Sequence, residues 1–257
     1  MQIHRQAEIV SARLAGSILS RGATAADGPM TEERLPFTVK VARSEQELGK
    51  AVHVRHAAYA RHLPALAERL KAPESYDRDE GSVVLLAQSK MDGSPLGTMR
   101  IQTNLYRKLA IEQAVALPEW LQGRALAEAT RLGVSDGRIG RVVKTVLFKA
   151  FFEYCLDAQI DWMVIAARSP LDRQYEALLF KDVFPGGGFI PLSYASNLPH
   201  RVLAFEVETA ETRWAAARHP LFDFMRRTRH PDIDVRETET AFGGAMRPAE
   251  WLVGVHA

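Results

Sequence analysis

The chain has 257 residues, of which 47% are hydrophobic and 25% charged, so it can bury a large core as one domain with or without extensions. A formal net charge of +2 is too small to indicate general nucleic-acid binding, and no apolar run approaches the roughly 20 residues of a membrane span. The N-terminus lacks the apolar core of a secretory signal. The single cysteine, Cys155, excludes an internal disulfide framework, and its aromatic neighbours favour a buried thiol over a nucleophile. We therefore expect a cytoplasmic protein without an integral membrane segment.

Residues 1–34 are expected to form an extension to a main domain at 35–257. Apolar residues recur at a near-helical period from Ile3 to Ile18, which predicts a helix over 2–21. Residues 22–34 are small and turn-rich, which is typical of a linker. The helix can dock on the main domain, lie on a membrane surface or fray, and the sequence leaves these alternatives open.

The main domain alternates predicted strands and helices. Alternating residues and short apolar runs predict strands at 37–41, 82–88, 96–103, 125–134, 162–167 and 202–209. A capping-box spacing, a wide apolar stripe and a Ser-Pro start predict helices at 44–62, 140–159 and 169–180; a fourth, interrupted by Pro220, is expected at 211–229. The turn at 91–95 predicts an antiparallel hairpin, and 105–124 is expected to be mostly helical or irregular.

The most informative stretch is Leu126–Val134 with the basic segment that follows it. This strand carries one carboxylate, Glu128, and one guanidinium, Arg131. It runs into a glycine-broken turn that opens a helix at Arg138–Arg141. A strand edge can hold an extended thioester arm, and a positive helix start can hold its phosphate. The arrangement indicates acyl transfer.

Four short motifs lie on successive elements of the main domain. They are Arg55-His-Ala-Ala-Tyr59 on the first long helix, Tyr76-Asp-Arg-Asp-Glu80 before the second strand, Gly97-Thr-Met-Arg100 on the third strand and Glu128-Ala-Thr-Arg131 on the fourth. With the order of elements, they resemble the GCN5-related N-acetyltransferase (GNAT) superfold over about residues 37–185. More specifically, they resemble its branch of acyl-homoserine-lactone synthases and acyl-carrier-protein-dependent N-acyl-amino-acid synthases. The resemblance implies an α/β (α+β) fold, with a mixed, mostly antiparallel central sheet flanked by helices.

Two departures from this branch bear on the substrates. The pyrophosphate loop of the acetyltransferases is present only in a degraded form, Gly137-Arg-Ile-Gly140-Arg141, which weighs against free coenzyme A as the acyl donor. The tryptophan that homoserine-lactone synthases usually carry after the aromatic position is replaced by Leu63-Pro-Ala-Leu66. This replacement favours the N-acyl-amino-acid relatives.

Amide formation from a thioester needs a neutral amine and a proton for the leaving thiolate. Glu128 is the candidate base, because a carboxylate on an apolar strand has a raised pKa unless it is paired. The alternative is a structural ion pair with Arg131 or Arg100. Strand alternation puts Glu128 and Arg131 on opposite faces, so a direct pair requires a bulge, which the resemblance implies for this strand. The resemblance also implies that Tyr175 protonates the thiolate; ordinary helix packing is the alternative.

The remaining candidate residues divide between two substrates. Arg100 and Arg131 are candidates for gripping a substrate carboxylate, although each can instead brace acidic residues such as Asp77. Arg55 is expected to brace, and the motifs add Tyr59 and Asp77 to the substrate side. For the acyl donor, the resemblance implies backbone contacts from Leu132 and Val134, and phosphate or carrier-protein contacts from Arg138, Gly140 and Arg141. An exposed solvated face is the alternative for the two arginines.

These inferences predict an N-acyltransferase that moves a long-chain acyl group from an acyl carrier protein, or from acyl-coenzyme A, to the amine of an amino acid. The attack is expected to be direct, without an acyl-enzyme, because Cys155 is expected to be buried. No bound cofactor is expected, and no metal, because no carboxylate or cysteine set completes a site with His53 and His56. The resemblance implies an apolar tunnel beside Val143, Leu147 and Phe151. Alternatives are a homoserine-lactone synthase using S-adenosylmethionine, an acetyl-coenzyme A-dependent N-acetyltransferase and a non-catalytic protein that binds an acylated carrier or ligand.

Overall fold

The structure, a computed structural model of the chain, describes residues 29–184, 186 and 188–236. The predicted helix at 2–21 and most of the predicted linker lie outside the described residues. Inside that linker, β1 (Thr31–Glu32) pairs with β10 (Thr228–Arg229), so the chain enters the fold before residue 35. No helix in the described ranges combines the length and apolar character needed to cross a membrane.

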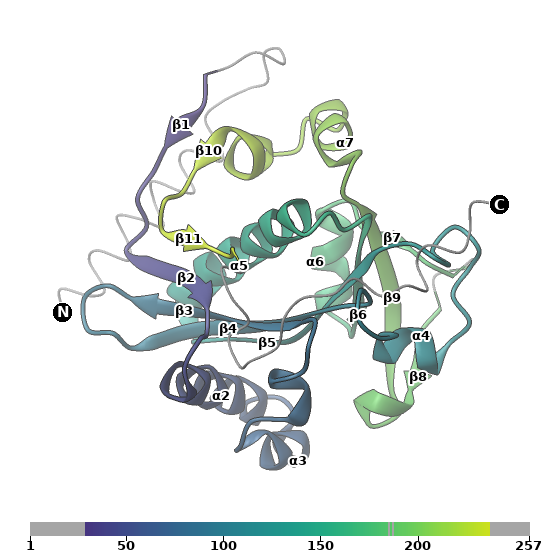
Figure 1. Cartoon of the computed structure of the whole chain (residues 1–257), viewed down its shortest axis with the longest axis horizontal. Helices are drawn as coiled ribbons and strands as arrows, with labels where there is room; N and C mark the ends of the chain where they lie inside the picture. The colour runs from purple at the N-terminus through teal and green to yellow at the C-terminus, as the bar shows by residue number, and fades with distance from the viewer. Residues whose placement is uncertain (1–28, 185, 187, 237–257) are drawn as a thin grey trace.

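The other described strands form one mixed sheet in the order β11–β2–β3–β4–β5–β6–β9–β7, and β8 pairs with the start of β9 (Figure 1). The pairs β5–β6 and β11–β2 are parallel and the rest are antiparallel, so the predicted mixed, mostly antiparallel sheet is confirmed. The strands are β2 (Phe37–Val41), β3 (Ser82–Ser89), β4 (Pro95–Thr103), β5 (Leu126–Val134), β6 (Trp162–Ala167), β7 (Lys181–Asp182), β8 (Ile190–Leu192), β9 (Leu198–Glu206) and β11 (Ile233–Asp234).

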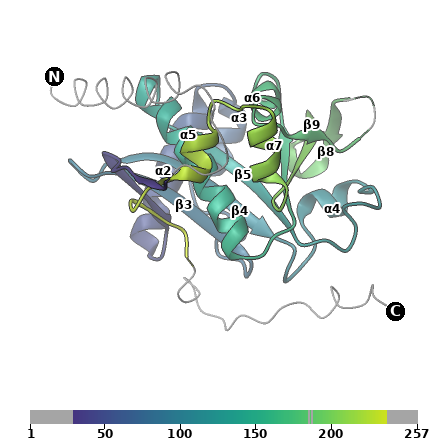
Figure 2. The ribbon, with the colours of Figure 1, turned by 90° about the horizontal axis from the view of Figure 1, so that it is seen from above.

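Helices cover both faces of the sheet. They are α2 (Glu45–Ala60), α3 (Pro64–Ala67), α4 (Ala110–Ala114), α5 (Gly137–Asp157), α6 (Leu171–Ala177) and α7 (Ala210–Ala216), with the 3₁₀ turns η1 (Glu68–Leu70), η2 (Ser75–Asp77) and η3 (Ser193–Ala195) and the π-helical turn η4 (Asp223–Arg227). Figure 1 places α5, α6 and α7 on one face and α2 and α3 on the other, and Figure 2 looks onto the α5 face.

Alternation along β4 assigns its polar side chains to one face. Met99 and Ile101 are fully buried in the main hydrophobic core, to which α5 contributes most of the helical side chains. The intervening Arg100 therefore points to the opposite face, against which α2 packs. A guanidinium group is thus held on the α2 face in the middle of a buried strand.

Several predicted elements have different bounds in the structure. The strand predicted at 202–209 is β9, which begins at Leu198 and ends at Glu206, and the helices predicted at 44–62 and 169–180 are the shorter α2 and α6. Helix α5 begins at Gly137 rather than residue 140, because the Asp136 side chain accepts a hydrogen bond from the Gly137 amide and caps the helix. The predicted helix at 211–229 is divided into α7 and the π-helical turn η4; the expected interruption at Pro220 is present, and Arg218 takes a left-handed conformation (φ 48°) just before it. In the predicted helical or irregular segment 105–124, the α-helix is limited to α4.

Strands β5 and β6 separate halfway along their length. Their pairing runs from Leu126 opposite Trp162 to Ala129 opposite Ile165, whereas β5 continues to Val134 and β6 to Ala167. On its other side β5 remains paired with β4 as far as Val134. The β6-facing edge of β5 therefore lacks a strand partner beyond Ala129, and this opening positions the candidate site.

Candidate active site

A bulge in β5 brings Arg131 onto the same face as Glu128. The β4–β5 register shifts between Thr98 and Arg100, and Arg131 has a left-handed backbone (φ 54°). The bulge that the resemblance implied for this strand is therefore confirmed. It does not, however, create a Glu128–Arg131 ion pair, because the Arg131 guanidinium binds Glu74 through Nε–Oε2 and Nη2–Oε1 contacts of 2.6 and 2.7 Å.

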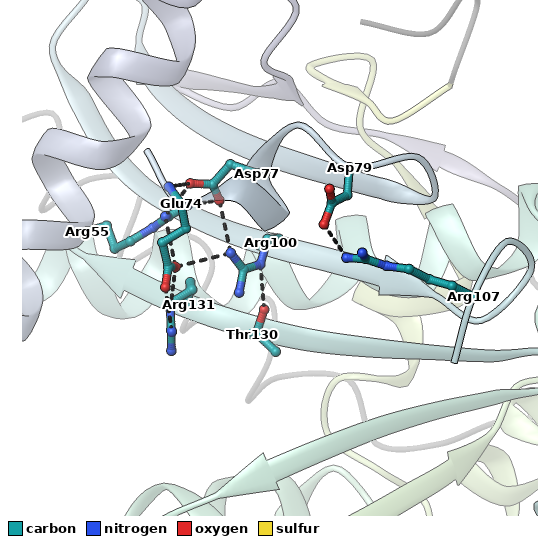
Figure 3. Close-up of polar contacts among 8 residues, drawn as sticks. All are labelled: Arg55, Glu74, Asp77, Asp79, Arg100, Arg107, Thr130 and Arg131. Atoms are coloured by element: carbon teal, nitrogen blue, oxygen red, sulfur yellow. Dashed lines mark hydrogen bonds and ion pairs between the residues drawn. The ribbon is translucent and has the colours of Figure 1, made fainter. Parts of the chain in front are cut away.

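Three arginines converge on two carboxylates beside this bulge (Figure 3). Arg55, fully buried on α2, forms two 2.8 Å hydrogen bonds with the two oxygens of Asp77. Arg100 donates Nη1 to Glu74 at 3.1 Å and to Asp77 at 3.3 Å, and its Nε to the Thr130 hydroxyl group. Sequence analysis expected Arg55 to hold acidic residues in place, and Arg55 does bind Asp77 in this way. Arg100 and Arg131 also contact these acids, although each guanidinium group keeps a nitrogen that is not hydrogen-bonded to them.

The Arg–Glu–Asp cluster, made of Arg55, Arg100, Arg131, Glu74 and Asp77, carries a charge that favours the binding of anions. Three guanidinium groups face two carboxylates, which leaves one positive charge in excess. Burial raises the pKa of Glu74 and of Asp77, but their hydrogen bonds and charge interactions with the arginines outweigh it and keep both pKa values below the ordinary range. Both carboxylates are thus ionised at neutral pH. Arg131 Nη1 and Arg100 Nη2 carry no hydrogen bond to a described residue, so each can still donate to a bound anion.

Glu128 lies on the same face of the sheet as Arg100 and is fully buried. It pairs in register with Gln102 on β4 and with Val164 on β6, one residue before β5 and β6 separate. Burial raises its pKa to about 7; a hydrogen bond from Tyr194, the more distant charges of Arg100 and Arg131 and the Ile111 backbone amide oppose that rise only in part. A carboxyl group that titrates near neutral pH is suited to accepting a proton from an amine.

The two oxygens of Glu128 have different surroundings. Oε1 accepts a 3.0 Å hydrogen bond from the Tyr194 hydroxyl group in η3. Oε2 is buried and has no hydrogen-bond partner among the described residues. A buried, unpartnered carboxylate oxygen is costly for a folded protein, and such atoms are concentrated at functional sites.

The donor-side candidates lie at the unpaired end of β5 and the start of α5. Leu132 is half-buried against the main core, and the carbonyl oxygen of Val134 accepts a 2.6 Å hydrogen bond from Arg61 at the end of α2. Arg138 and Arg141 are exposed on the first turns of α5. Gly140 is sterically required there, because a Cβ atom at this position would overlap the carbonyl oxygen of Ser135.

Tyr175 lies on the other face of the sheet from Glu128. Its ring packs against Phe148 and Phe180, and it lines a mainly apolar cavity of about 360 Å³ between α5, α6 and residues 219–225. Burial raises its pKa, and the nearby Tyr59 of α2 adds to the rise. Burial lowers the pKa of Arg131, but Glu74 and, to a smaller extent, Tyr59 raise it above its ordinary value.

The residues beside which an acyl tunnel was expected lie in the main core. Val143 and Leu147 are fully buried in the main core, and a Cβ atom at Gly97 would collide with Val143. The apolar cavity lined by Lys144, Thr145 and Phe148 lies at the same level of α5, on the side of the helix that faces α6. Cys155 is buried and its pKa is raised well above the ordinary value, as expected for an unreactive thiol. Within the described ranges, no three His, Cys, Asp or Glu side chains converge as a metal site.

Sequence analysis missed three of the residues that complete this arrangement. Glu74 lies three residues before Asp77, and the Asp77 side chain caps its amide, but no pattern linked Glu74 to Arg131. Tyr194 and Arg61 reach Glu128 and Val134 from distant parts of the chain. An isolated tyrosine in a loop and an arginine at a helix end carry no sequence signal that predicts these contacts.

No protein-family model and no curated protein matches the chain in sequence. Among solved structures, the chain is similar to FeeM, an N-acyl amino acid synthase from uncultured soil microbes, over 68% of this chain and 93% of that one, with 18% identity and a TM-score of 0.56. It is also similar to BjaI, a CoA-dependent acyl-homoserine lactone synthase with SAM and isopentyl-CoA, over 76% and 93% of the two chains, with 18% identity and a TM-score of 0.51. The chain therefore has the fold of these proteins, the GNAT-type fold that the resemblance implied.

Proposed function

We propose that the protein is an N-acyltransferase that moves a long-chain acyl group from an acyl carrier protein thioester to the amine of an amino acid. The observation that carries the proposal is the buried Glu128 carboxylate. One of its oxygens has no hydrogen-bond partner among the described residues, and the carboxylate lies within electrostatic range of Arg100 and Arg131 at the point where β5 and β6 separate. The likeness to FeeM and BjaI supports the fold in which this chemistry is proposed.

In the proposed reaction, the amine nitrogen attacks the thioester carbonyl carbon, a C–N bond forms and the C–S bond breaks. Glu128 Oε2 accepts a proton from the amine, and the leaving thiolate takes up one proton. When the acceptor enters as an ammonium ion, one proton is released overall. Tyr175 is the proposed proton donor to the thiolate, as the resemblance implied, and it lines the apolar cavity between α5 and α6.

The excess positive charge of the Arg–Glu–Asp cluster supports an acceptor with a carboxylate. An α-amino acid places its amine and its carboxylate one carbon apart, so the amine can meet Glu128 while the carboxylate meets Arg131 Nη1 or Arg100 Nη2. Arg131 is partly exposed whereas Arg100 is almost fully buried, so Arg131 is the first contact proposed for the carboxylate.

The unpaired edge of β5 and the basic start of α5 support a carrier-bound donor. Backbone groups beyond Ala129 can pair with the amides of a phosphopantetheine arm, and Arg138 and Arg141 lie where its phosphate or an acidic carrier surface would arrive. Asp136 already caps the helix through the Gly137 amide, which makes this start less suited to a bare diphosphate. We therefore favour acyl carrier protein over coenzyme A.

The test is incubation of the full chain with long-chain acyl carrier protein, a mixture of amino acids and S-adenosylmethionine, followed by mass spectrometry of the lipid extract. An N-acyl amino acid would support the proposal and name the acceptor, and Glu128→Gln should abolish it. Formation of an acyl-homoserine lactone would instead support the hypothesis that the protein is a homoserine-lactone synthase. An intact thioester with folded protein would refute both.

The donor is tested by comparing acyl carrier protein with acyl-coenzyme A of the same chain length. Charge reversal in Arg141→Glu should raise the KM for the carrier-bound donor by about tenfold while leaving kcat similar, because a rim charge acts mainly on encounter. The matched control is Lys71→Glu, an exposed lysine outside α5 that pairs with Glu68. Equal use of both donors by the wild type would remove the carrier protein from the proposal.

A further inference from the structure

We infer that Tyr194 is a positioning residue for Glu128: it holds one carboxylate oxygen in place and leaves the other directed at the acceptor amine. The inference rests on the proposed function, because it assigns Glu128 the role of base. It adds a residue from outside the four sequence motifs and gives the loop between β8 and β9 a part in the reaction.

The geometry of Tyr194 matches this role. Its hydroxyl group donates to Glu128 Oε1 at 3.0 Å across a sequence separation of 66 residues. The hydroxyl is thereby used as a donor, and Oε2 is left buried without a described partner. A carboxylate fixed at one oxygen loses rotational freedom, so its second oxygen keeps one direction for an incoming proton.

The loop that carries Tyr194 is itself held in one conformation. Ser196 and Asn197 have left-handed backbones (φ 59° and 53°), and the Asn197 amide closes the turn onto the carbonyl oxygen of Leu192 at 2.9 Å. The Tyr194 ring packs against the second hydrophobic cluster, which includes Leu126 and Val164. Apolar burial of the ring therefore delivers the hydroxyl group to Glu128 as a rigid donor.

Tyr194 also affects how much of Glu128 is ionised. The groups that face Glu128 are the Tyr194 hydroxyl from η3, Arg100 from β4, Arg131 from β5 and the Ile111 backbone from α4. Burial raises the pKa of Glu128 to about 7, and the hydrogen bond from Tyr194 is the largest of the opposing effects. Without that hydroxyl group, the pKa should rise further, and less of the base should be ionised at neutral pH.

The experiment compares Tyr194→Phe with the wild type in two measurements. The first is the pH dependence of kcat/KM, in which the midpoint of the acid limb should rise by about one unit, so that the rate falls about tenfold below the midpoint and recovers at high pH. The second is an infrared titration of the Glu128 carboxyl band, identified by its loss in Glu128→Gln. This band should show the same shift without requiring any substrate. The control is Tyr154→Phe, which alters another buried tyrosine, on α5, and should leave both midpoints unchanged.

Each outcome decides a separate point. A uniform loss of rate with an unchanged midpoint would mean that Tyr194 only supports packing, and it would overturn the inference. An unshifted infrared midpoint would overturn it equally. If the wild type transfers no acyl group but the infrared midpoint shifts, the contact with Glu128 is established while the proposed function fails.

Discussion

Arg131 forms its ion pair with Glu74, 57 residues away, and not with Glu128, three residues before it on the same strand. The consequence is that Glu128 has no cation in direct contact. Burial then dominates its electrostatics and raises its pKa to about 7. The same pair neutralises part of the charge on Arg131 and fixes its guanidinium through two hydrogen bonds. Glu74 therefore controls both groups proposed to meet the amino acid.

Glu74→Gln should redirect Arg131 toward Glu128. A guanidinium group close to Glu128 favours its charged form, so the acid limb of the rate profile should move to lower pH. The free energy of unfolding should fall by about 2 kcal/mol, because Arg131 and Arg100 lose a charged partner. Chemical denaturation and a pH–rate profile measure the two effects. Glu68→Gln, which removes an exposed pair with Lys71, is the control and should change neither. A profile that does not move would contradict the coupling.

Glu128→Gln should make the protein more stable and less active. Between the ordinary carboxyl pKa of 4.5 and the folded value of about 7, the folded protein binds more protons than the unfolded chain, so the wild type loses stability as pH rises through this window. The amide does not titrate, so the variant should lack this loss and be more stable by about 1–3 kcal/mol above pH 7. Denaturation at several pH values tests this. Equal stability of the variant and the wild type at high pH would show that the pKa of Glu128 is not raised by folding.

The rate of acyl transfer should depend on the ionisation of Glu128. Because the base is active only when deprotonated, kcat/KM should fall about tenfold for each unit of pH below about 7. Glu128→Gln should be slower by at least about 100-fold and should lose this acid limb. Initial rates of thiol release across the pH range provide the measurement. A wild-type rate independent of pH below 7 would assign the base elsewhere.

Gly140→Ala should disrupt the turn from β5 into α5. An added Cβ atom would overlap the Ser135 carbonyl oxygen, which is backbone and cannot move aside without shifting the strand end. We expect a loss of about 1–3 kcal/mol in unfolding free energy together with weaker donor binding. Gly49→Ala is the matched control, because Gly49 lies inside α2 with nothing within 4 Å of an added Cβ, and alanine is the better helix former. The control should be neutral or stabilising, and similar behaviour of both variants would argue against the steric requirement.

Local patterns in the sequence predicted most elements of the fold. Ser44 caps α2 with Glu47 as the spacing indicated, and the 82–88 and 96–103 segments pair as an antiparallel hairpin. These features depend on residues within a few positions of each other, so periodicity and turn chemistry are sufficient to predict them. The C-terminal helical segment is interrupted near Pro220 as expected, but the left-handed backbone of Arg218 and the short lengths of α7 and η4 had no local signal.

The sequence by itself also identified several residues of the candidate site, because Arg55, Asp77, Arg100, Glu128 and Arg131 occur in ordered motifs. Only the tertiary structure decided how they pair. A bulge of one residue moved Arg131 onto the face of Glu128, and Glu74 then took its guanidinium. Tyr194 reached Glu128 from a loop beyond β8. Contacts over 57 and 66 residues depend on strand register and loop closure, which no local pattern encodes. The residue types determined which chemistry is available. Tertiary packing determined which residues pair, and therefore the pKa of Glu128.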